Sequence, residues 1–134
     1  MVGKNILEHP YAEKYKFFAP DIPDLDLFNF EAVKEYIAKV KPDFIIHAAG
    51  RVGGIQANMA NPVAFLLENL DMGRNLVWAA RQCGVKKLLN LGSSCMYPRN
   101  AVNPLKEEMV LQGELEPTNE GYAIAKTVGV KMCE

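Results

Sequence analysis

Three polar side chains in the second half of the chain are suited to proton transfer at a carbonyl or hydroxyl carbon. Tyr122 and Lys126 are four residues apart, a spacing that places both on one face of a helix. A nearby ammonium stabilises the phenolate and lowers the pKa of a phenol from about 10 toward the working pH. Tyr122 is therefore a candidate proton shuttle, and the hydroxyl of Ser93 is a candidate to hold the same substrate oxygen. Because this spacing also occurs on solvated helix faces, the surrounding sequence must show whether Tyr122 and Lys126 are a functional pair.

The elements that must position these residues alternate between strand and helix. Two short apolar runs, residues 44–49 and 87–92, predict strands that are buried on both faces of a sheet. Between them, residues 62–83 predict a long helix with Asn61 as its N-cap and Gly84 just past its end. A strand, a helix and a second strand form a βαβ unit with a right-handed crossover.

The remaining segments complete an α/β pattern. Residues 30–40 predict an amphipathic helix capped by Asn29, and residues 122–133 predict a third helix. A short strand over residues 16–18 is weakly indicated. Residues 97–118 contain several prolines and little periodicity, so they predict a long loop. The whole pattern is typical of an open parallel sheet with covering helices.

In such sheets, ligands bind beyond the carboxyl ends of the strands. Ser93 and Ser94 follow the second predicted strand, and Ala48 and Ala49 follow the first. Small side chains at this edge allow a cofactor to approach the backbone closely. The candidate chemistry therefore falls where this architecture places its ligands.

Composition excludes several classes of function. A net charge of -1 without a long run of one sign gives no electrostatic footprint for nucleic acid or an acidic membrane, and no apolar stretch is long enough to span a bilayer. The three cysteines, Cys83, Cys95 and Cys133, are an odd count without a C-x-x-C pair, which argues against a disulfide framework or a structural zinc site. We expect no metal and a reducing, cytoplasmic compartment.

Three stretches, residues 47–55, 91–98 and 111–126, resemble the extended short-chain dehydrogenase/reductases. Within them the match is to the GDP-L-fucose synthase family, the GDP-4-keto-6-deoxymannose epimerase/reductases. The Val-Gly-Gly-Ile, Gly-Ser-Ser-Cys and Glu-Pro-Thr-Asn-Glu runs are together far more specific than Tyr-x-x-x-Lys alone. The resemblance implies a Rossmann-type fold, an NADP cofactor, GDP-4-keto-6-deoxymannose as substrate and a homodimer of the full-length enzyme.

The same resemblance implies a role for each matching residue. Tyr122 is the general acid that protonates the C4 oxygen of the substrate during hydride transfer, and Ser93 hydrogen-bonds that oxygen. Lys126 binds the nicotinamide ribose and lowers the pKa of Tyr122. Cys95 matches the cysteine that removes or returns a proton at C3 and C5. The residues expected to line the cofactor site, from the fold or from the resemblance, are Gly3, Ala48, Ala49, Leu91, Gly92, Ser93, Ser94, Tyr122 and Lys126.

The chain also departs from the family pattern. Family members open with a strand and a Gly-x-x-Gly-x-x-Gly loop that holds the pyrophosphate, of which only Gly3, the last glycine, is recognisable here. The chain stops at Glu134, soon after the predicted catalytic helix. We therefore expect residues 1–134 to be a single truncated NAD(P)-binding domain. It would have a partial doubly wound sheet that lacks the first strand and the C-terminal substrate domain, and it would be inactive in isolation.

Some alternatives stay open at this stage. Residues 18–26 offer aspartates but no arginine for a 2′-phosphate, and an aspartate near the ribose favours NAD. Cys95 has a second interpretation as a small buried hydrophobe, and His47 is better explained as a core histidine than as a catalyst. Gly53 and Gly54 either lie near the cofactor or form a turn.

Two further functions compete with the first. The chain could be another nucleotide-sugar epimerase or dehydratase of the same superfamily. Cys95 argues against this, because a 4-epimerase that only oxidises and reduces C4 needs no thiol. The chain could also be a non-catalytic module with weak binding or self-association.

Overall fold

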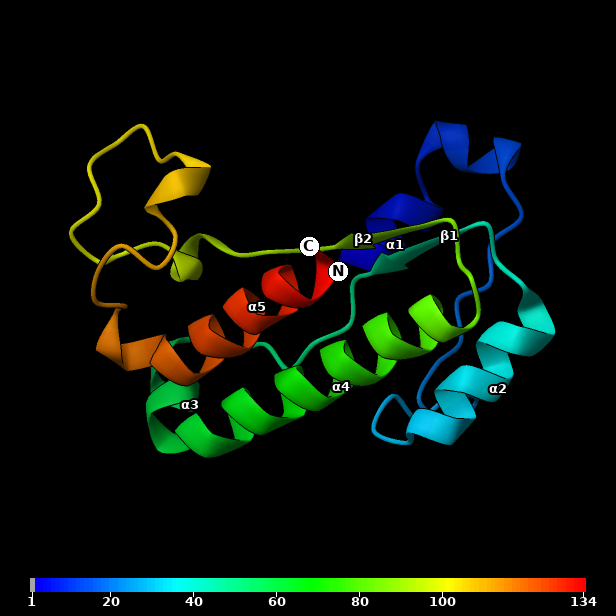
Figure 1. The fold of residues 1–134 in the computed structure, drawn as a ribbon, viewed down its shortest axis with the longest axis horizontal. Helices are drawn as coiled ribbons and strands as arrows, with labels where there is room; N and C mark the ends of the chain where they lie inside the picture. The colour runs from blue at the N-terminus through cyan, green and yellow to red at the C-terminus, as the bar shows by residue number, and fades with distance from the viewer. Residues whose placement is uncertain (1) are drawn as a thin grey trace.

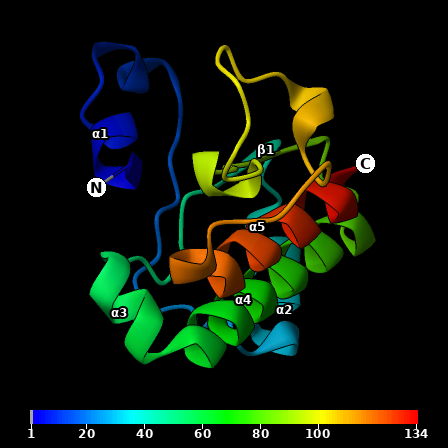
Figure 2. The ribbon, with the colours of Figure 1, turned by 90° about the vertical axis from the view of Figure 1, so that its left-hand side faces the viewer.

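The computed structural model describes residues 2–134 and shows an α/β arrangement with a two-stranded parallel sheet (Figure 1). Strand β1 pairs with β2 in a register that places Phe44 opposite Lys87 and His47 opposite Asn90. Three helices, α2, α4 and α5, lie on one side of the sheet (Figure 2). The elements are α1 (Val2–Leu7), α2 (Phe30–Val40), β1 (Phe44–His47), α3 (Ile55–Ala60), α4 (Pro62–Gln82), β2 (Lys87–Asn90) and α5 (Glu120–Cys133), with 3-10 turns at Pro10–Lys14, Ser94–Met96, Glu107–Met109 and Pro117–Asn119.

The predicted strand–helix–strand unit is confirmed. Helix α4 connects the two parallel strands along the chain and ends at Gln82. Its C-cap, Cys83, is followed by Gly84, which has a φ of 69°. Glycine adopts this left-handed conformation without strain, which explains why the helix stops there. Asn61 occupies the N-cap position, but its side chain makes no capping hydrogen bond.

The predicted helix α2 is also confirmed, together with its cap. The side chain of Asn29 accepts a hydrogen bond from the backbone N–H of Ala32 at 3.1 Å. On α4, the buried Asn75 donates to the backbone carbonyls of Leu27 and Phe28, which ties the segment before α2 to α4. The core between the two helices consists of Val33, Ile37, Leu76, Ala79 and Ala80.

The sheet is covered on one face only in the described residues. Because side chains alternate along a strand, Phe44 and Ile46 point away from the helices and are 61% and 41% exposed, and Leu89 on β2 is 53% exposed. The prediction that both strands are buried on both faces is therefore wrong for this part of the protein. Residues 16–18 form no strand here, and α1 and α3 were not predicted.

No helix within residues 2–134 is both long and apolar enough to cross a lipid bilayer.

Candidate active site

Helix α5 carries Tyr122 and Lys126 and lies directly against α4 (Figure 1). Its inner face consists of small residues, Ala123, Ala125, Thr127 and Gly129, all of them buried. At Gly121 the approach is closest, because a Cβ built there would lie 2.6 Å from the carbonyl oxygen of Pro62. The small face lets α5 sit deep against α4 and leaves Tyr122 and Lys126 half-buried at its border.

Replacing Gly121 with alanine is expected to destabilise the protein by about 1–3 kcal/mol, because the new methyl group meets backbone that must shift. The measurement is the free energy of unfolding by urea. Gly54→Ala is the matched control, since a Cβ at Gly54 meets nothing within 4 Å. We expect that control to change stability by about 0.5 kcal/mol or less, and equal losses in the two variants would contradict the close approach of α5.

The structure brings Lys126 to the end of strand β2. Its Nζ donates a hydrogen bond to the carbonyl oxygen of Leu91 at 2.8 Å and lies 5.9 Å from the centroid of the Tyr122 ring. Burial lowers the pKa of the Lys126 ammonium. Helix α5 and the end of strand β2 are thus joined by a direct contact.

The pKa of Tyr122 is raised, opposite to the direction that the Tyr-x-x-x-Lys spacing suggested. Burial of the phenol is the main cause, the Ser93 side chain acts in the opposite direction, and negative charge on Cys95 adds to the rise. Tyr122 therefore holds its proton firmly near neutral pH and is better described as an acid than as a phenolate base.

Cys95 lies on the 3-10 turn Ser94–Met96 that follows β2. The Oγ of Ser93 accepts a hydrogen bond from the Cys95 backbone N–H at 3.3 Å, and the Nδ2 of Asn119 lies 3.2 Å from the Cys95 Sγ. The thiol is free and half-buried, while its neighbour Met96 is fully buried. The turn thus keeps Cys95 accessible beside Ser93 and Tyr122, so that hydroxyl, phenol and thiol converge.

The residues predicted to line a cofactor site share one edge of the sheet. Ala48 and Ala49 follow β1, Gly92 and Ser94 follow β2, and all four are exposed. Gly3 in α1 lies close by, since a Cβ built on it would be 3.9 Å from the Cβ of Ala48. These residues fit a dinucleotide, because small exposed side chains leave the backbone open to close approach.

Two buried asparagines hold the loop after β1, and sequence reasoning missed both. Asn69 on α4 accepts from the N–H of Arg51 and donates to its carbonyl, each at 3.0 Å. Asn58 on α3 donates to the carbonyls of Gly53 and Gly54 at 3.0 and 3.1 Å. Gly54 is the N-cap of α3, so these glycines form the turn that starts this helix. For Asn69, its place on the apolar face of the predicted helix 62–83 is the signal that could have revealed it, whereas Asn58 lay on no predicted helix.

His47 ends strand β1 and is 4% exposed. Its pKa is lowered from 6.5 to about 4, chiefly because burial disfavours the imidazolium and secondly because of the positive charge of Lys126. Its Nδ1 has no hydrogen-bond partner among the described residues. His47 is thus a buried core residue, as expected, and it is neutral near pH 7.

This histidine predicts a specific dependence of stability on pH. Between pH 6.5 and about 4 the unfolded chain binds a proton at His47 that the folded chain does not, so stability rises with pH across this window. We expect lowering the pH from 7 to 4 to cost about 3 kcal/mol through this group alone. Urea unfolding at several pH values should show a smaller loss in His47→Leu and an unchanged loss in His9→Gln, which replaces an exposed histidine. Identical pH profiles for all three proteins would contradict the prediction.

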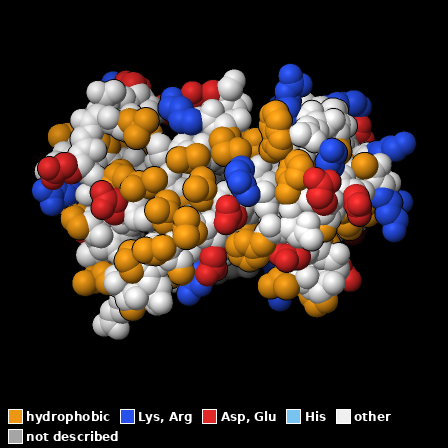
Figure 3. Space-filling view, turned by 60° about the horizontal axis from the view of Figure 1, so that its bottom comes forward, with side chains coloured by type: hydrophobic (Ala, Val, Ile, Leu, Met, Phe, Trp, Pro, Cys, Tyr) orange, Lys and Arg blue, Asp and Glu red, His pale blue; other side chains and the backbone are white. Residues whose placement is uncertain are grey.

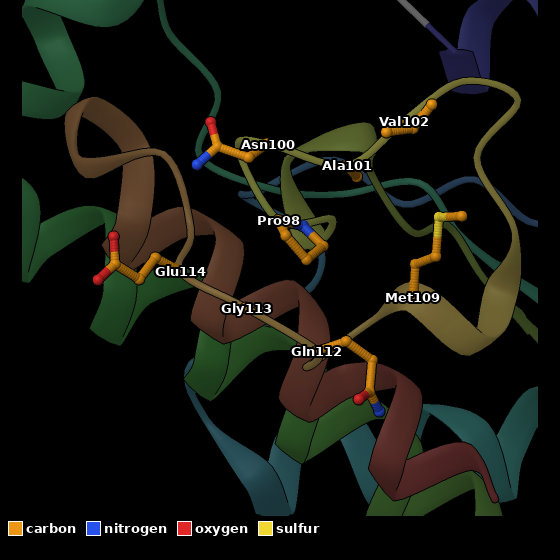
Figure 4. Close-up of a pocket in the computed structure, with 8 residues that line it drawn as sticks. All are labelled: Pro98, Asn100, Ala101, Val102, Met109, Gln112, Gly113 and Glu114. Atoms are coloured by element: carbon orange, nitrogen blue, oxygen red, sulfur yellow. The ribbon is translucent and has the colours of Figure 1, made fainter.

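A separate depression of about 380 Å³ lies in the long loop after Met96 (Figure 4). Two parts of the loop face one another across it, one following Pro98 and one ending at Glu114. None of the predicted catalytic residues lines it. Its lining residues are Pro98, Asn100, Ala101, Val102, Met109, Gln112, Gly113 and Glu114.

The chain belongs to the NAD dependent epimerase/dehydratase family, whose model matches residues 1–134. Over all 134 residues it is 55% identical to the GDP-L-colitose synthase of Yersinia pseudotuberculosis and 50% identical to the GDP-L-fucose synthase of Azorhizobium caulinodans. These matches cover 44% and 43% of the two relatives, so the chain spans less than half of their length. The resemblance that the sequence showed is confirmed.

A solved structure supports the same assignment of the fold. MlghC, a GDP-mannoheptose C4 reductase from Campylobacter jejuni with NADP bound, is 39% identical and superposes with a TM-score of 0.81. The superposition covers 86% of this chain and 36% of that one. The predicted Rossmann-type fold is therefore confirmed for the part that the chain represents.

Proposed function

We propose that the protein is a nicotinamide-dependent GDP-sugar epimerase/reductase that converts GDP-4-keto-6-deoxymannose to GDP-L-fucose, with residues 1–134 supplying part of a single NAD(P)-binding domain. The observation that carries this proposal is the convergence of Tyr122, Ser93 and Cys95 at the carboxyl end of β2. A protonated phenol and a thiol at one site suit two different proton transfers. Ketone reduction needs an acid at the oxygen, and epimerisation needs a base at the neighbouring carbons.

In the reduction, bound NADPH supplies the hydride. Tyr122 donates its proton to the C4 oxygen as negative charge develops there, and Ser93 hydrogen-bonds the same oxygen. The raised pKa of Tyr122 supports this role, because the phenol keeps its proton until the developing alkoxide takes it. Lys126, whose Nζ donates to the Leu91 carbonyl, would contact the ribose of a bound cofactor, and its positive charge would stabilise the oxyanion.

In the epimerisation, Cys95 acts on the carbons next to the keto group. Its thiolate removes a proton from C3 or C5, and inversion requires that a group other than Cys95 returns a proton from the opposite face. The C4 oxygen carries the enolate charge that results, and Tyr122 and Ser93 lie where they stabilise it.

NADP is the proposed cofactor, and this choice rests on the relative whose structure contains NADP. Ala48, Ala49, Leu91, Gly92 and the serines at positions 93 and 94 would lie against the dinucleotide, together with Gly3. Asp21 and Asp24 are exposed in the segment before α2, where an acidic side chain favours the ribose of NAD. Comparing turnover with NADPH and NADH decides between the two cofactors.

A GDP-L-colitose synthase reaction is the second candidate, favoured by the 55% identity to that relative. We propose that the residues above serve either reaction. Supplying the 4-keto precursors of GDP-L-fucose and of GDP-L-colitose separately, and comparing kcat/KM, distinguishes the two.

We also propose a homodimer for the full-length protein. Apolar side chains gather over the helical face of the molecule (Figure 3). On α4 and α5 these include Val63, Leu67, Trp78 and Ile124, which are 64%, 49%, 53% and 39% exposed, respectively. A surface of this kind supports association between copies. The three free cysteines support a reducing, cytoplasmic location.

The proposed function is tested with a chimera. These residues replace the matching stretch of the Azorhizobium GDP-L-fucose synthase, and the purified chimera receives GDP-4-keto-6-deoxymannose and NADPH. We expect cofactor oxidation, followed by absorbance, and GDP-L-fucose as the product, identified by chromatography. A folded chimera that consumes no NADPH with this or the colitose precursor would show that the proposal is wrong.

A further inference from the structure

Asn119 occupies the N-cap position of α5 but makes no capping hydrogen bond with its side chain. Asparagine is a preferred N-cap because its side-chain oxygen accepts a hydrogen bond from the first turn of the helix. Asn29 makes this interaction at the start of α2. The side chain of Asn119 is therefore used for something other than its own helix.

The amide of Asn119 is turned toward Cys95 instead. Its Nδ2 donates to the Cys95 Sγ across 3.2 Å, and its Oδ1 is buried without a hydrogen-bond partner among the described residues. The Asn119 side chain therefore does not cap α5, and its Oδ1 accepts no hydrogen bond among the described residues, but its Nδ2 contacts the Cys95 sulfur. That contact is the polar interaction that fixes its orientation.

The run Glu-Pro-Thr-Asn-Glu, to which the proposed mechanism assigns no role, holds Asn119 in this position. The Glu116 carboxylate accepts from the backbone N–H of Thr118 at 3.3 Å and from its hydroxyl at 3.0 Å. The N–H of Asn119 donates to the carbonyl of Glu116 at 3.2 Å. These bonds close the 3-10 turn Pro117–Asn119 and fix the backbone from which the Asn119 amide reaches Cys95.

We propose that Asn119 is a positioning residue for Cys95, which orients the sulfur and stabilises the negative charge that it carries as a thiolate. An amide N–H is a donor, and an ionised sulfur accepts hydrogen bonds more strongly than a neutral thiol does. The proposal rests on the proposed function only where it concerns epimerisation. The control of Cys95 by Asn119 is measurable without substrate.

The first experiment measures alkylation of Cys95 by iodoacetamide at pH 7, quantified by mass spectrometry on the tryptic peptide of residues 88–99. We expect Asn119→Ala to slow alkylation about tenfold, because the thiolate loses its hydrogen-bond donor. Asn119→Asp should slow it further, since a carboxylate of the same shape then faces the sulfur. Equal rates in all three proteins, or faster alkylation in either variant, would overturn the proposal.

Stability separates this role from a merely structural one. Asn119→Ala removes no capping bond, so we expect its thermal unfolding midpoint to stay close to that of the unsubstituted chain. Asn29→Ala is the matched control: it should lower the midpoint through the lost cap and leave the alkylation rate unchanged. A slower alkylation in Asn29→Ala equal to that of Asn119→Ala would mean that reactivity follows stability, which overturns the proposal.

The second experiment uses the chimera in deuterated water. We expect Asn119→Ala to slow deuterium incorporation at C3 and C5 about tenfold while KM for NADPH stays unchanged. Unaltered deuterium incorporation would overturn the assignment of Asn119 to epimerisation. If alkylation depends on Asn119 but the unsubstituted chimera has no activity, the proposed function fails while the control of Cys95 by Asn119 stands.

Discussion

Replacing Tyr122 with phenylalanine is expected to lower kcat of the chimera about 10²–10⁴-fold, the usual contribution of a positioned general acid. The substitution removes the proton donor and keeps the ring, which lies 5.9 Å from the Lys126 ammonium. Because the phenol acts on the charge that develops at the C4 oxygen, the loss should fall on kcat and leave KM for NADPH nearly unchanged.

The measurement is steady-state oxidation of NADPH, with tryptophan fluorescence used to follow cofactor binding. Tyr36→Phe is the matched control, since Tyr36 is a half-buried tyrosine on α2, away from the strand ends. We expect that control to retain full turnover. Unchanged kcat in Tyr122→Phe would falsify the role assigned to this residue.

Replacing Cys95 with serine is expected to separate the two halves of the reaction. An alcohol is a far weaker acid than a thiol, so a serine at this position is almost never ionised and cannot serve as the base at C3 and C5. We expect deuterium incorporation from solvent at these carbons to fall about 10²–10⁴-fold. Reduction at C4 should continue, because Tyr122 and Ser93 are intact, and it should yield a 6-deoxyhexose that has not been epimerised.

The product is identified by nuclear magnetic resonance of the reduced sugar. Cys83→Ser is the control: the Cys83 Sγ lies 3.6 Å from the carbonyl of Lys34, between α4 and α2, and has no part in the proposed chemistry. GDP-L-fucose as the main product of Cys95→Ser at the unsubstituted rate would remove Cys95 from the mechanism.

Sequence patterns predicted the elements that depend on local chemistry. Apolar runs bounded by proline and glycine located β1 and β2, and Asn29 and Gly84 marked where α2 begins and where α4 has ended. The strand ends then placed Ser93 and Ser94 at the same edge as Ala48 and Ala49, because parallel strands present their carboxyl ends at one edge of the sheet.

The interactions that sequence reasoning missed depend on which side chain reaches which backbone group across the fold. The direction of the pKa shift of Tyr122 depends chiefly on its burial, and the bond from Lys126 to the Leu91 carbonyl joins groups that are 35 residues apart in the chain. Asn69 and Asn119 were likewise not predicted to hold a loop and a thiol. Their residue type indicates a helix cap or a turn, and only the packing of α4 and α5 turns their amides elsewhere.

The uncovered face of the small sheet has a consequence for how the chain behaves among other copies of itself. Each strand has only one partner in the described residues, so β1 and β2 each present one open edge beside the apolar side chains of Phe44, Ile46 and Leu89. An open edge accepts any strand of suitable geometry, whether it comes from the same polypeptide or from a neighbouring molecule. Protein concentration therefore decides which of these partners the edge finds, and dilute solution favours the intramolecular one.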